Sequence, residues 1–525
     1  MRSLFKNKTA LIFAGLLLYL YFRGIGDHGL IDPLEGVNSS VEVHMLATGN
    51  YFVPKVGDEL VAGKSLLTWW LSALAIKIFG WGEFSVRFLS ALSGALMILS
   101  SAISARRSKE YSSRKSWLAA SICASMSICF TVSQIASSHA VYACLTGLAL
   151  MYILKGFDDK NYFVQAHICI VLAFMAHGAG GFVFPFMAMM IFAALNFEYE
   201  KAVNFFTWPP AALISVSGIG CYILMLMYGN GWVLHFMRCE HLSLDLENIL
   251  GYVLFAFAAF IPWHGFIINS ARNVFLNYKD NPRRTFMLIW SIIFGLAAIL
   301  SGDLLSLGTC APALSALMGD YIDDWLEQKH FTEIKISAAL TLVIIFPAVA
   351  LLLPLAVDIF PVVSACLLSI VPYGLFMVLF LFACWYYTRT KQVKKWARNI
   401  PAAALLCLMP LTGIFDLTAE KLSAREAALT IRSDIQGNNL IIQYEINHPS
   451  MYFYTFRNSL LVNPILTPGL QDLKAKISVE TLNNLWSGRE RIFMIINADN
   501  KVPNNLTGHI YRLLDDGEVL LLSNK

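Results

Sequence analysis

Long apolar runs recur along the chain, and they constrain its fold more than any other feature of the sequence. Runs of roughly 17–22 apolar residues are long enough, as helices, to cross a hydrocarbon core of ~30 Å. Only 14% of the 525 residues are charged, whereas a soluble globular domain usually has about 25%. A chain inside lipid must satisfy its own backbone hydrogen bonds, which favours helices for these runs. The sequence therefore predicts a polytopic α-helical membrane protein.

The apolar runs and their breaks predict about thirteen transmembrane helices. They lie near residues 9–25, 84–104, 116–133, 138–154, 162–178, 181–196, 209–228, 249–270, 286–301, 304–320, 336–353, 366–387 and 400–416. The first run follows three basic residues and is long for the core of a signal peptide. We therefore interpret it as an uncleaved signal anchor.

The basic residues predict the orientation, because Lys and Arg are enriched in cytoplasmic loops. With an odd number of spans, the basic clusters all fall on the side of the N-terminus, at the N-terminus itself, 106–115, 272–284 and 389–398. The N-terminus is then cytoplasmic and the C-terminus lies outside. A net charge of only +4 gives no reason to expect nucleic acid as a partner.

Composition divides the chain into a transmembrane domain, 1–416, and a polar C-terminal segment, 417–525. Short apolar runs in that segment predict strands near 439–444, 491–498, 509–514 and 518–522, with helices at 419–436 and near 468–486. We expect a small α/β domain on the outer face. Loop 26–83 shares that face, and its apolar stretch 65–80 is short and contains Lys77, which is typical of an interfacial helix.

Loop 26–83 also contains polar residues next to the first span. Asp32 and Glu35 flank a proline-containing turn, His44 follows, and Lys64 precedes the apolar stretch. Charged residues at the bilayer are costly and mark functional sites in membrane proteins. This loop is therefore the first place to look for a site.

The loop resembles that of the polyprenyl-phosphate-dependent glycosyltransferases of the GT-C class, in particular the aminoarabinose (lipid A) transferase family. That family reads D-P-D-E-x-R-Y, M-L-x-S-G-D-W-x-x-P, E-K-P-P-L-x-Y-W and F-G-x-x-E-F-x-x-R. The matching segments here are Asp32–Glu35, Met45–Pro54, Lys64–Trp70 and Phe79–Arg87. Farther along, Arg238–His241 resembles an R-E-H segment, and Tyr452–Arg457 resembles a strand that reads F-Y-T-x-R.

The resemblance implies a GT-C fold in the bacterial inner membrane, with the C-terminal domain in the periplasm. It implies transfer, with inversion, of a sugar such as aminoarabinose from polyprenyl phosphate to lipid A or to another envelope lipid or glycan. The expected partners are thus the polyprenyl-phosphate sugar donor, a lipid or glycan acceptor and membrane lipids.

The resemblance also implies roles for individual residues. A carboxylate accepts the proton of an acceptor hydroxyl, and Lys or Arg stabilises the leaving phosphate. We expect Glu35 and Asp32 to be catalytic and Lys64 and Arg87 to bind the donor phosphate. Contacts with the substrate are expected from His44, His139, Glu240 and His241. The class allows a divalent metal held by carboxylate and histidine ligands, but the sequence assigns no ligands and predicts no other cofactor.

Several residues depart from the family pattern. Leu34 replaces the first acid of the D-E pair, and Gly63 replaces the acid before the lysine. Other family positions that carry Asp, Lys, Lys and Tyr correspond to His139, His177, Leu304 and Gly308. These losses keep a second interpretation open, a catalytically degenerate relative that binds carrier lipid or a partner. A transporter is a third and weaker interpretation, because the sequence reveals no paired broken helices.

Overall fold

The computed structural model describes residues 8–57, 59–61, 66–105, 113–228, 249–359, 367–435, 437, 439–464, 476–498, 500, 502–503, 506 and 508–525. The chain divides into two compact units. The helical unit comprises the described residues within Met1–Ile25, Arg87–Leu224 and Glu240–Ile414. The sheet unit comprises those within Gly26–Val86, Met225–Cys239 and Phe415–Lys525. Loop 26–83 and the C-terminal segment, which are far apart in the sequence, thus belong to one unit.

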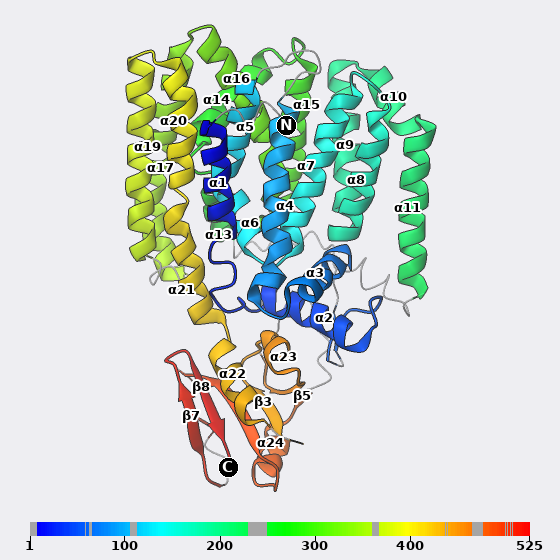
Figure 1. Ribbon diagram of the computed structural model, residues 1–525, viewed down its shortest axis with the longest axis vertical. Coiled ribbons are helices and arrows are strands. Elements are labelled where there is room, and N and C mark those ends of the chain that lie inside the picture. The colour runs from blue at the N-terminus through cyan, green and yellow to red at the C-terminus, as the bar shows by residue number, and fades with distance from the viewer. Residues whose placement is uncertain are drawn as a thin grey trace. The chain divides into compact units, whose positions relative to one another are not determined.

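Apolar helices build the helical unit, and Figure 1 shows the long ones running roughly alongside one another. Their bounds are α1 (Lys8–Phe22), α4 (Glu83–Ser104), α5 (Ser113–Ser125), α6 (Ser127–Gln134), α7 (Ser138–Gly156), α8 (Tyr162–His177), α9 (Gly180–Asn196), α10 (Tyr199–Thr207), α11 (Pro209–Tyr228), α13 (Ile249–Ala259), α14 (His264–Leu276), α15 (Pro282–Leu300), α16 (Ala311–Glu327), α17 (Phe331–Ile359), α19 (Leu367–Arg389) and α20 (Val393–Leu406), with short 3-10 helices η2 (Leu304–Cys310) and η3 (Met409–Leu411). Helix α4 begins within the sheet unit, and α21 (Thr412–Leu422) belongs to the sheet unit from Phe415 onward.

Within the described residues, five helices are long and apolar enough to cross a membrane, or up to seven if each bent pair is one span. The sequence predicts thirteen spans, and that count stays a prediction. Several predicted spans coincide closely with single helices, among them 84–104 with α4, 138–154 with α7 and 286–301 with α15. The apolar runs therefore locate these helices well.

Two of the other predicted spans, 116–133 and 249–270, are each divided into two helices. The run 116–133 is divided into α5 and α6, which are bent by 60° at Met126, where the backbone is extended. In the run 249–270, Pro262 separates α13 from α14. Proline also ends α10, which the sequence did not predict, and α10 meets α11 at 51°, because Pro209 and Pro210 cannot continue the hydrogen bonds of the preceding helix. The sequence analysis missed these bends.

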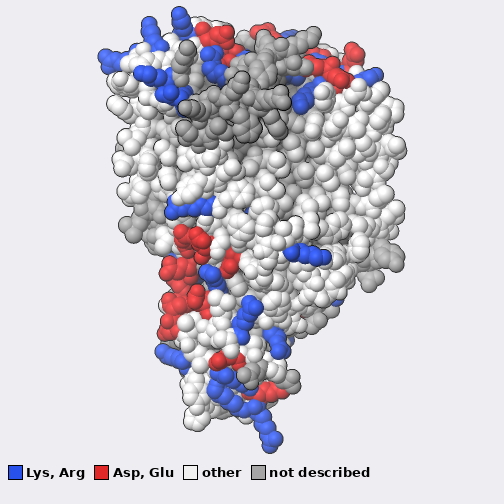
Figure 2. All heavy atoms as spheres, viewed as in Figure 1, with Lys and Arg blue, Asp and Glu red and all other residues white. Residues whose placement is uncertain are grey.

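Charged side chains gather at one end of the helical unit, beside a broad uncharged band (Figure 2). Helices α5, α15 and α16 meet at such a cluster. Asp320 Oδ1 lies 2.7 Å from Lys115 Nζ, and Asp320 Oδ2 lies 2.5 Å from Arg284 Nε. Asp323 pairs with Arg114, and Asp324 pairs with Arg284. These ion pairs join the ends of three helices that are distant in sequence.

The sheet unit contains a six-stranded sheet in the order β5-β4-β3-β6-β8-β7. Its strands are β3 (Leu440–Tyr444), β4 (Ser459–Val462), β5 (Lys476–Ile477), β6 (Ile492–Asn497), β7 (Tyr511–Asp515) and β8 (Val519–Ser523), and its helices are α2 (Leu34–Thr48), α3 (Leu66–Phe79), α22 (Arg425–Asp434), α23 (Ser450–Thr455) and α24 (Val479–Trp486), with a small hairpin of β1 (Lys55–Val56) and β2 (Glu59–Leu60). Strands β3 to β6 pair in parallel, whereas β8 is antiparallel to β6 and β7. The four predicted strands correspond to β3, β6, β7 and β8.

The core of this sheet explains why those strands were predictable. Every residue of β8 is buried, as are the first five of β6, and strands buried on both faces read as continuous apolar runs. The sequence also predicts a helix at 65–80, and α3 confirms it. The expected helix at 419–436 is divided between α21 and α22.

One predicted strand is wrong. Tyr452–Arg457 resembles a strand of the glycosyltransferase family, but most of it belongs to the short helix α23, which begins at Ser450 after Pro449. The Ser450 N–H at its start donates to Asp32 Oδ1 at 3.0 Å. A carboxylate that accepts from an unpaired N–H stabilises a helix start, and this one comes from a residue 418 positions away. The local sequence could not reveal it.

Candidate functional site

Asp32 lies where loop 26–83 contacts the C-terminal segment. Besides the Ser450 N–H, it accepts a short hydrogen bond from the Ser450 hydroxyl, and its Oδ2 lies 3.2 Å from His448 Nδ1. Its side chain is 3% exposed. Asp32 therefore has a structural role in the sheet unit, holding the start of α23, whatever part it has in chemistry.

Glu35 lies in the first turn of α2 and is fully buried. Its Oε2 accepts a hydrogen bond of 2.8 Å from the Ile31 N–H, as a carboxylate in the first turn of a helix commonly does with a preceding backbone N–H. Leu34, which stands where the family has an acid, is 37% exposed. The exposed position of this turn is thus apolar, and the two neighbouring acids are buried.

A second buried acid lies two turns farther along α2. Glu42 is 2% exposed, and its Oε2 makes no hydrogen bond with any described residue. Burial raises the pKa of Glu42 well above its usual value, a hydrogen bond with Ser72 lowers it, and the charge of Glu35 raises it again. The sequence analysis overlooked Glu42, because an acid within a mixed apolar and polar helix carries no sign of its burial.

His44 is on the rim of an open groove in the sheet unit. Its Nδ1 lies 3.1 Å from the Tyr452 hydroxyl. The groove has a volume of about 630 Å³, and its polar lining includes Arg457, Asn458 and Glu490. This groove offers both charges and an aromatic ring to a polar ligand.

The remaining expected contacts are divided between described and undescribed parts of the chain. Arg87 is fully buried in α4, and its Nη1 donates to the Ile25 carbonyl oxygen at 2.9 Å. A buried guanidinium held in this way supports the junction of two segments of the helical unit. Lys64, Glu240 and His241 lie outside the described residues.

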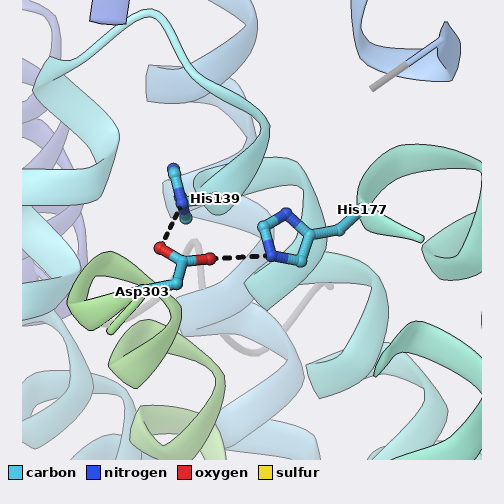
Figure 3. Close-up of side chains that lie close together, drawn as sticks. All are labelled: His139, His177 and Asp303. Atoms are coloured by element: carbon cyan, nitrogen blue, oxygen red, sulfur yellow. Dashed lines mark hydrogen bonds and ion pairs between the residues drawn. The ribbon is translucent and has the colours of Figure 1, made fainter. Parts of the chain in front are cut away.

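His139 belongs to a cluster of three side chains at the ends of helices in the helical unit (Figure 3). It is the second residue of α7, and its Nε2 lies 2.8 Å from Asp303 Oδ1. His177 is the last residue of α8, and its Nε2 lies 3.0 Å from Asp303 Oδ2. Asp303 itself lies between α15 and η2. We call His139, His177 and Asp303 the His–Asp–His cluster.

The surroundings of the His–Asp–His cluster hold its side chains in place. Tyr142 stacks on the His177 ring with 4.3 Å between ring centroids, and Ser306 Oγ donates to Asp303 Oδ2 at 2.7 Å. Burial raises the pKa of Asp303, but His139 and then His177 lower it well below its usual value. Asp303 is therefore charged at neutral pH. Two imidazoles and a carboxylate in this arrangement can exchange a proton or bind a divalent cation.

The sequence analysis assigned His139 to the site, considered His177 near a span end for the same role, and missed Asp303. A signal was present for Asp303, because it directly follows an apolar run, where polar residues face water or a site. What the sequence lacks is the register between helices, since His139 and Asp303 are 164 positions apart.

Comparisons with known proteins found similar sequences among glycosyltransferases. Residues 63–223 match the family model described as dolichyl-phosphate-mannose-protein mannosyltransferase. An uncharacterised protein of Aquifex aeolicus is 24% identical over 373 residues, which are 67% of this chain and 71% of that protein. The undecaprenyl phosphate-alpha-4-amino-4-deoxy-L-arabinose arabinosyl transferase 1 of Proteus mirabilis is 21% identical over 353 residues. That match covers 63% of this chain and 62%, less than two thirds, of the Proteus protein.

A solved structure is similar over almost the whole length. It is the crystal structure of ArnT from Cupriavidus metallidurans bound to undecaprenyl phosphate, with a TM-score of 0.78 and 15% identity over 98% of both chains. At this identity the match shows the fold alone, and the fold is that of ArnT. The resemblance to the polyprenyl-phosphate-dependent GT-C glycosyltransferases of the aminoarabinose transferase type is therefore confirmed, at the low identity of a diverged relative.

Proposed function

We propose that the protein is a membrane glycosyltransferase that uses a polyprenyl-phosphate sugar as donor. One observation carries this proposal. The names of the matched family model and of the Proteus relative differ in the sugar and in the isoprenoid, yet both state a sugar on an isoprenoid phosphate. The shared part of the two names supports the donor class. The acceptor proposed here is lipid A or another envelope lipid or glycan, and the sugar is an amino sugar such as aminoarabinose, transferred with inversion.

The proposed location is the bacterial inner membrane, with the reaction on the periplasmic face. The ion-pair cluster of Lys115 and Arg284 lies near the start of α15, and Asp303 follows the end of that helix. The 19 residues of α15 rise about 28 Å at 1.5 Å each, close to the thickness of a hydrocarbon core. If the basic end is cytoplasmic, the His–Asp–His cluster is on the outer side.

The roles of single residues are proposed as before: Glu35 and Asp32 as catalytic carboxylates, and Lys64 and Arg87 as residues that bind the donor phosphate. His44, His139, Glu240 and His241 are proposed to contact substrate. Both acids are buried, so this role requires that the residues that cover them move when a substrate binds. A phosphate acceptor, which is already anionic, would need no strong base and so fits a chain that lacks one acid of the usual pair.

The experiment is mass spectrometry of envelope lipids and glycans from a deletion strain complemented with wild type or Glu35→Gln. Glutamine retains an oxygen that can accept from the Ile31 N–H, so the variant is expected to fold. We expect a sugar-sized mass with wild type and a loss of about 100-fold or more with Glu35→Gln, the effect of removing a general base or acid. Glu420→Gln, at an exposed position of α21, is the control and should behave like wild type.

A second candidate function is favoured by one observation, the apolar and exposed Leu34 beside two buried acids. In this alternative the chain binds carrier lipid without transferring a sugar. No new mass with any variant, together with saturable binding of undecaprenyl phosphate to the purified protein, would favour the alternative. Full transfer by Glu35→Gln at normal abundance would contradict the assignment of Glu35.

A further inference from the structure

We propose that the His–Asp–His cluster is a binding site for one divalent transition-metal ion of the zinc type. Each of the three residues offers one ligand atom, and these atoms all lie within 4.8 Å of one another. Figure 3 shows both imidazoles directed at the same carboxylate. Imidazole nitrogen and carboxylate oxygen are ordinary ligands of Zn²⁺, at about 2.0–2.2 Å.

The hydrogen bonds of the cluster mark where such an ion would lie. A carboxylate only accepts, so Nε2 of each histidine carries the proton in the two contacts of 2.8 and 3.0 Å with Asp303. Ligand atoms around a tetrahedral Zn²⁺ are about 3.3 Å apart, given bonds of about 2.0–2.1 Å. The ligand atoms of the three residues lie within 4.8 Å of one another, so an ion that replaces these two protons requires them to approach one another by about 1.5 Å at most. The imidazole protons move to Nδ1.

The Nδ1 atoms are already placed for that exchange. His139 Nδ1 lies 3.1 Å from Ser137 Oγ, and His177 Nδ1 lies 3.1 Å from Ser138 Oγ. Ser137 is at the N-cap position of α7, yet its hydroxyl makes no capping hydrogen bond. Metal-binding histidines regularly donate their second N–H to a fixed oxygen, which orients the ring. Both rings of the cluster have such an oxygen.

Local backbone conformation and side-chain contacts hold the ligands in place. Gly178 follows His177 with a positive φ of 89°, a conformation that ends α8 and that glycine adopts without strain. The Tyr142 ring stacks on His177, and Ser306 holds Asp303. A preorganised ligand set of this kind loses little freedom when it binds an ion.

Three protein ligands leave coordination positions open, as in catalytic zinc sites. The Asp303 side chain is 33% exposed, whereas the side chains of His139 and His177 are 10% and 14% exposed. Two neutral imidazoles and one carboxylate leave a net charge of +1 on a divalent site, which attracts an anionic oxygen. A phosphate oxygen of the donor lipid fits that position, and this last step rests on the proposed function, whereas binding of the ion does not.

The test measures Zn²⁺ on the purified full-length protein in detergent, after chelator treatment, incubation with zinc and removal of the excess. We expect one zinc per chain by elemental mass spectrometry. Affinity from calorimetry should fall at least tenfold in His177→Gln and Asp303→Asn. The double variant Ser137→Ala, Ser138→Ala should lose about 10–100-fold, the usual effect of removing such hydrogen bonds. His509→Ala, at an exposed position of the sheet unit, should bind like wild type.

The outcomes separate this proposal from the proposed function. Wild type without stoichiometric zinc, or equal binding by wild type and Asp303→Asn, would overturn the metal site. Co²⁺ in place of zinc should give the visible absorption of a four- or five-coordinate ion in wild type and lose it in His177→Gln. If a ligand variant fails to elute as a folded monodisperse protein, the double serine variant, which leaves all ligands in place, is used instead. A lower zinc affinity of that variant supports the metal site, and an unchanged affinity contradicts it. Zinc binding without any sugar transfer would retain the site and count against the transferase alone.

Discussion

At the scale of single residues, the buried acids of α2 are its most unusual feature, because a simple amphipathic helix exposes its charged residues to water. Glu35 and Glu42 lie two helical turns apart and are both almost fully buried. The sequence identified Glu35 because it follows a proline-containing turn in a motif. It gave no reason to single out Glu42, since burial depends on α3 and Ser72, which the local pattern does not show. Sequence motifs thus find residues at turns more readily than residues inside the unit.

Glu42 gives a prediction for stability against pH. Its pKa is raised in the folded protein above the ordinary value of 4.5, so the folded state retains a proton that the unfolded state loses. Stability therefore falls as the pH rises from about 4.5 to the folded pKa. Glu42→Gln removes this penalty and should raise the thermal midpoint near pH 7.5 but not near pH 4. Thermal unfolding in detergent measures both.

The control for this prediction is the exposed Glu420→Gln, which should shift neither midpoint. An equal stabilisation by Glu42→Gln at both pH values would contradict the explanation, because the gain would then come from packing and not from charge.

At the scale of elements, apolar length located helices well but could not detect where they bend. The runs for α4, α7 and α15 end within a few residues of the observed helices. The expected span 304–320 instead begins with the 3-10 helix η2 and continues as α16. Asp303 precedes η2 and is held there by His139 and His177 from other helices. Contacts between helices therefore determine this boundary, and a hydropathy pattern does not contain them.

The ion pairs that join α5, α15 and α16 should be important for stability. Asp320 is 5% exposed and accepts from both Lys115 and Arg284. Asp320→Ala leaves two largely buried cations without this partner, a change that costs about 3–5 kcal/mol in comparable buried pairs. The thermal midpoint in detergent should fall by several degrees. Glu327→Ala on the same helix, where the glutamate is 71% exposed, should change it little, since exposed pairs contribute about 0–1 kcal/mol.

Equal midpoints for Asp320→Ala and wild type would contradict this prediction, because removing one partner of a buried ion pair leaves the other charge uncompensated. That result would mean that Asp324, which also pairs with Lys115 and Arg284, is a sufficient partner for both cations.

At the scale of the whole molecule, the sequence predicted the class and most of the sheet, but not how the chain divides. Strands buried on both faces appear as apolar runs, which is why β3, β6 and β8 were recognisable. The shorter β4 and β5 have four and two residues, too few to show a pattern. The grouping of residues 26–86 with the C-terminal segment depends on contacts such as Asp32 with Ser450, which no composition boundary at residue 417 could indicate.

The orientation proposed from the basic clusters leads to the last prediction. An odd number of spans with a cytoplasmic N-terminus puts the C-terminus, and with it the sheet unit, in the periplasm. Alkaline phosphatase, which is active only after export, should therefore be active when fused after Lys525. It should be inactive when fused after Asp280, which precedes α15 in a basic loop. A green fluorescent protein fusion should give the opposite pattern, because it fluoresces only in the cytoplasm. Active phosphatase at residue 280 and inactive phosphatase at 525 would reverse the orientation, and the His–Asp–His cluster would then face the cytoplasm.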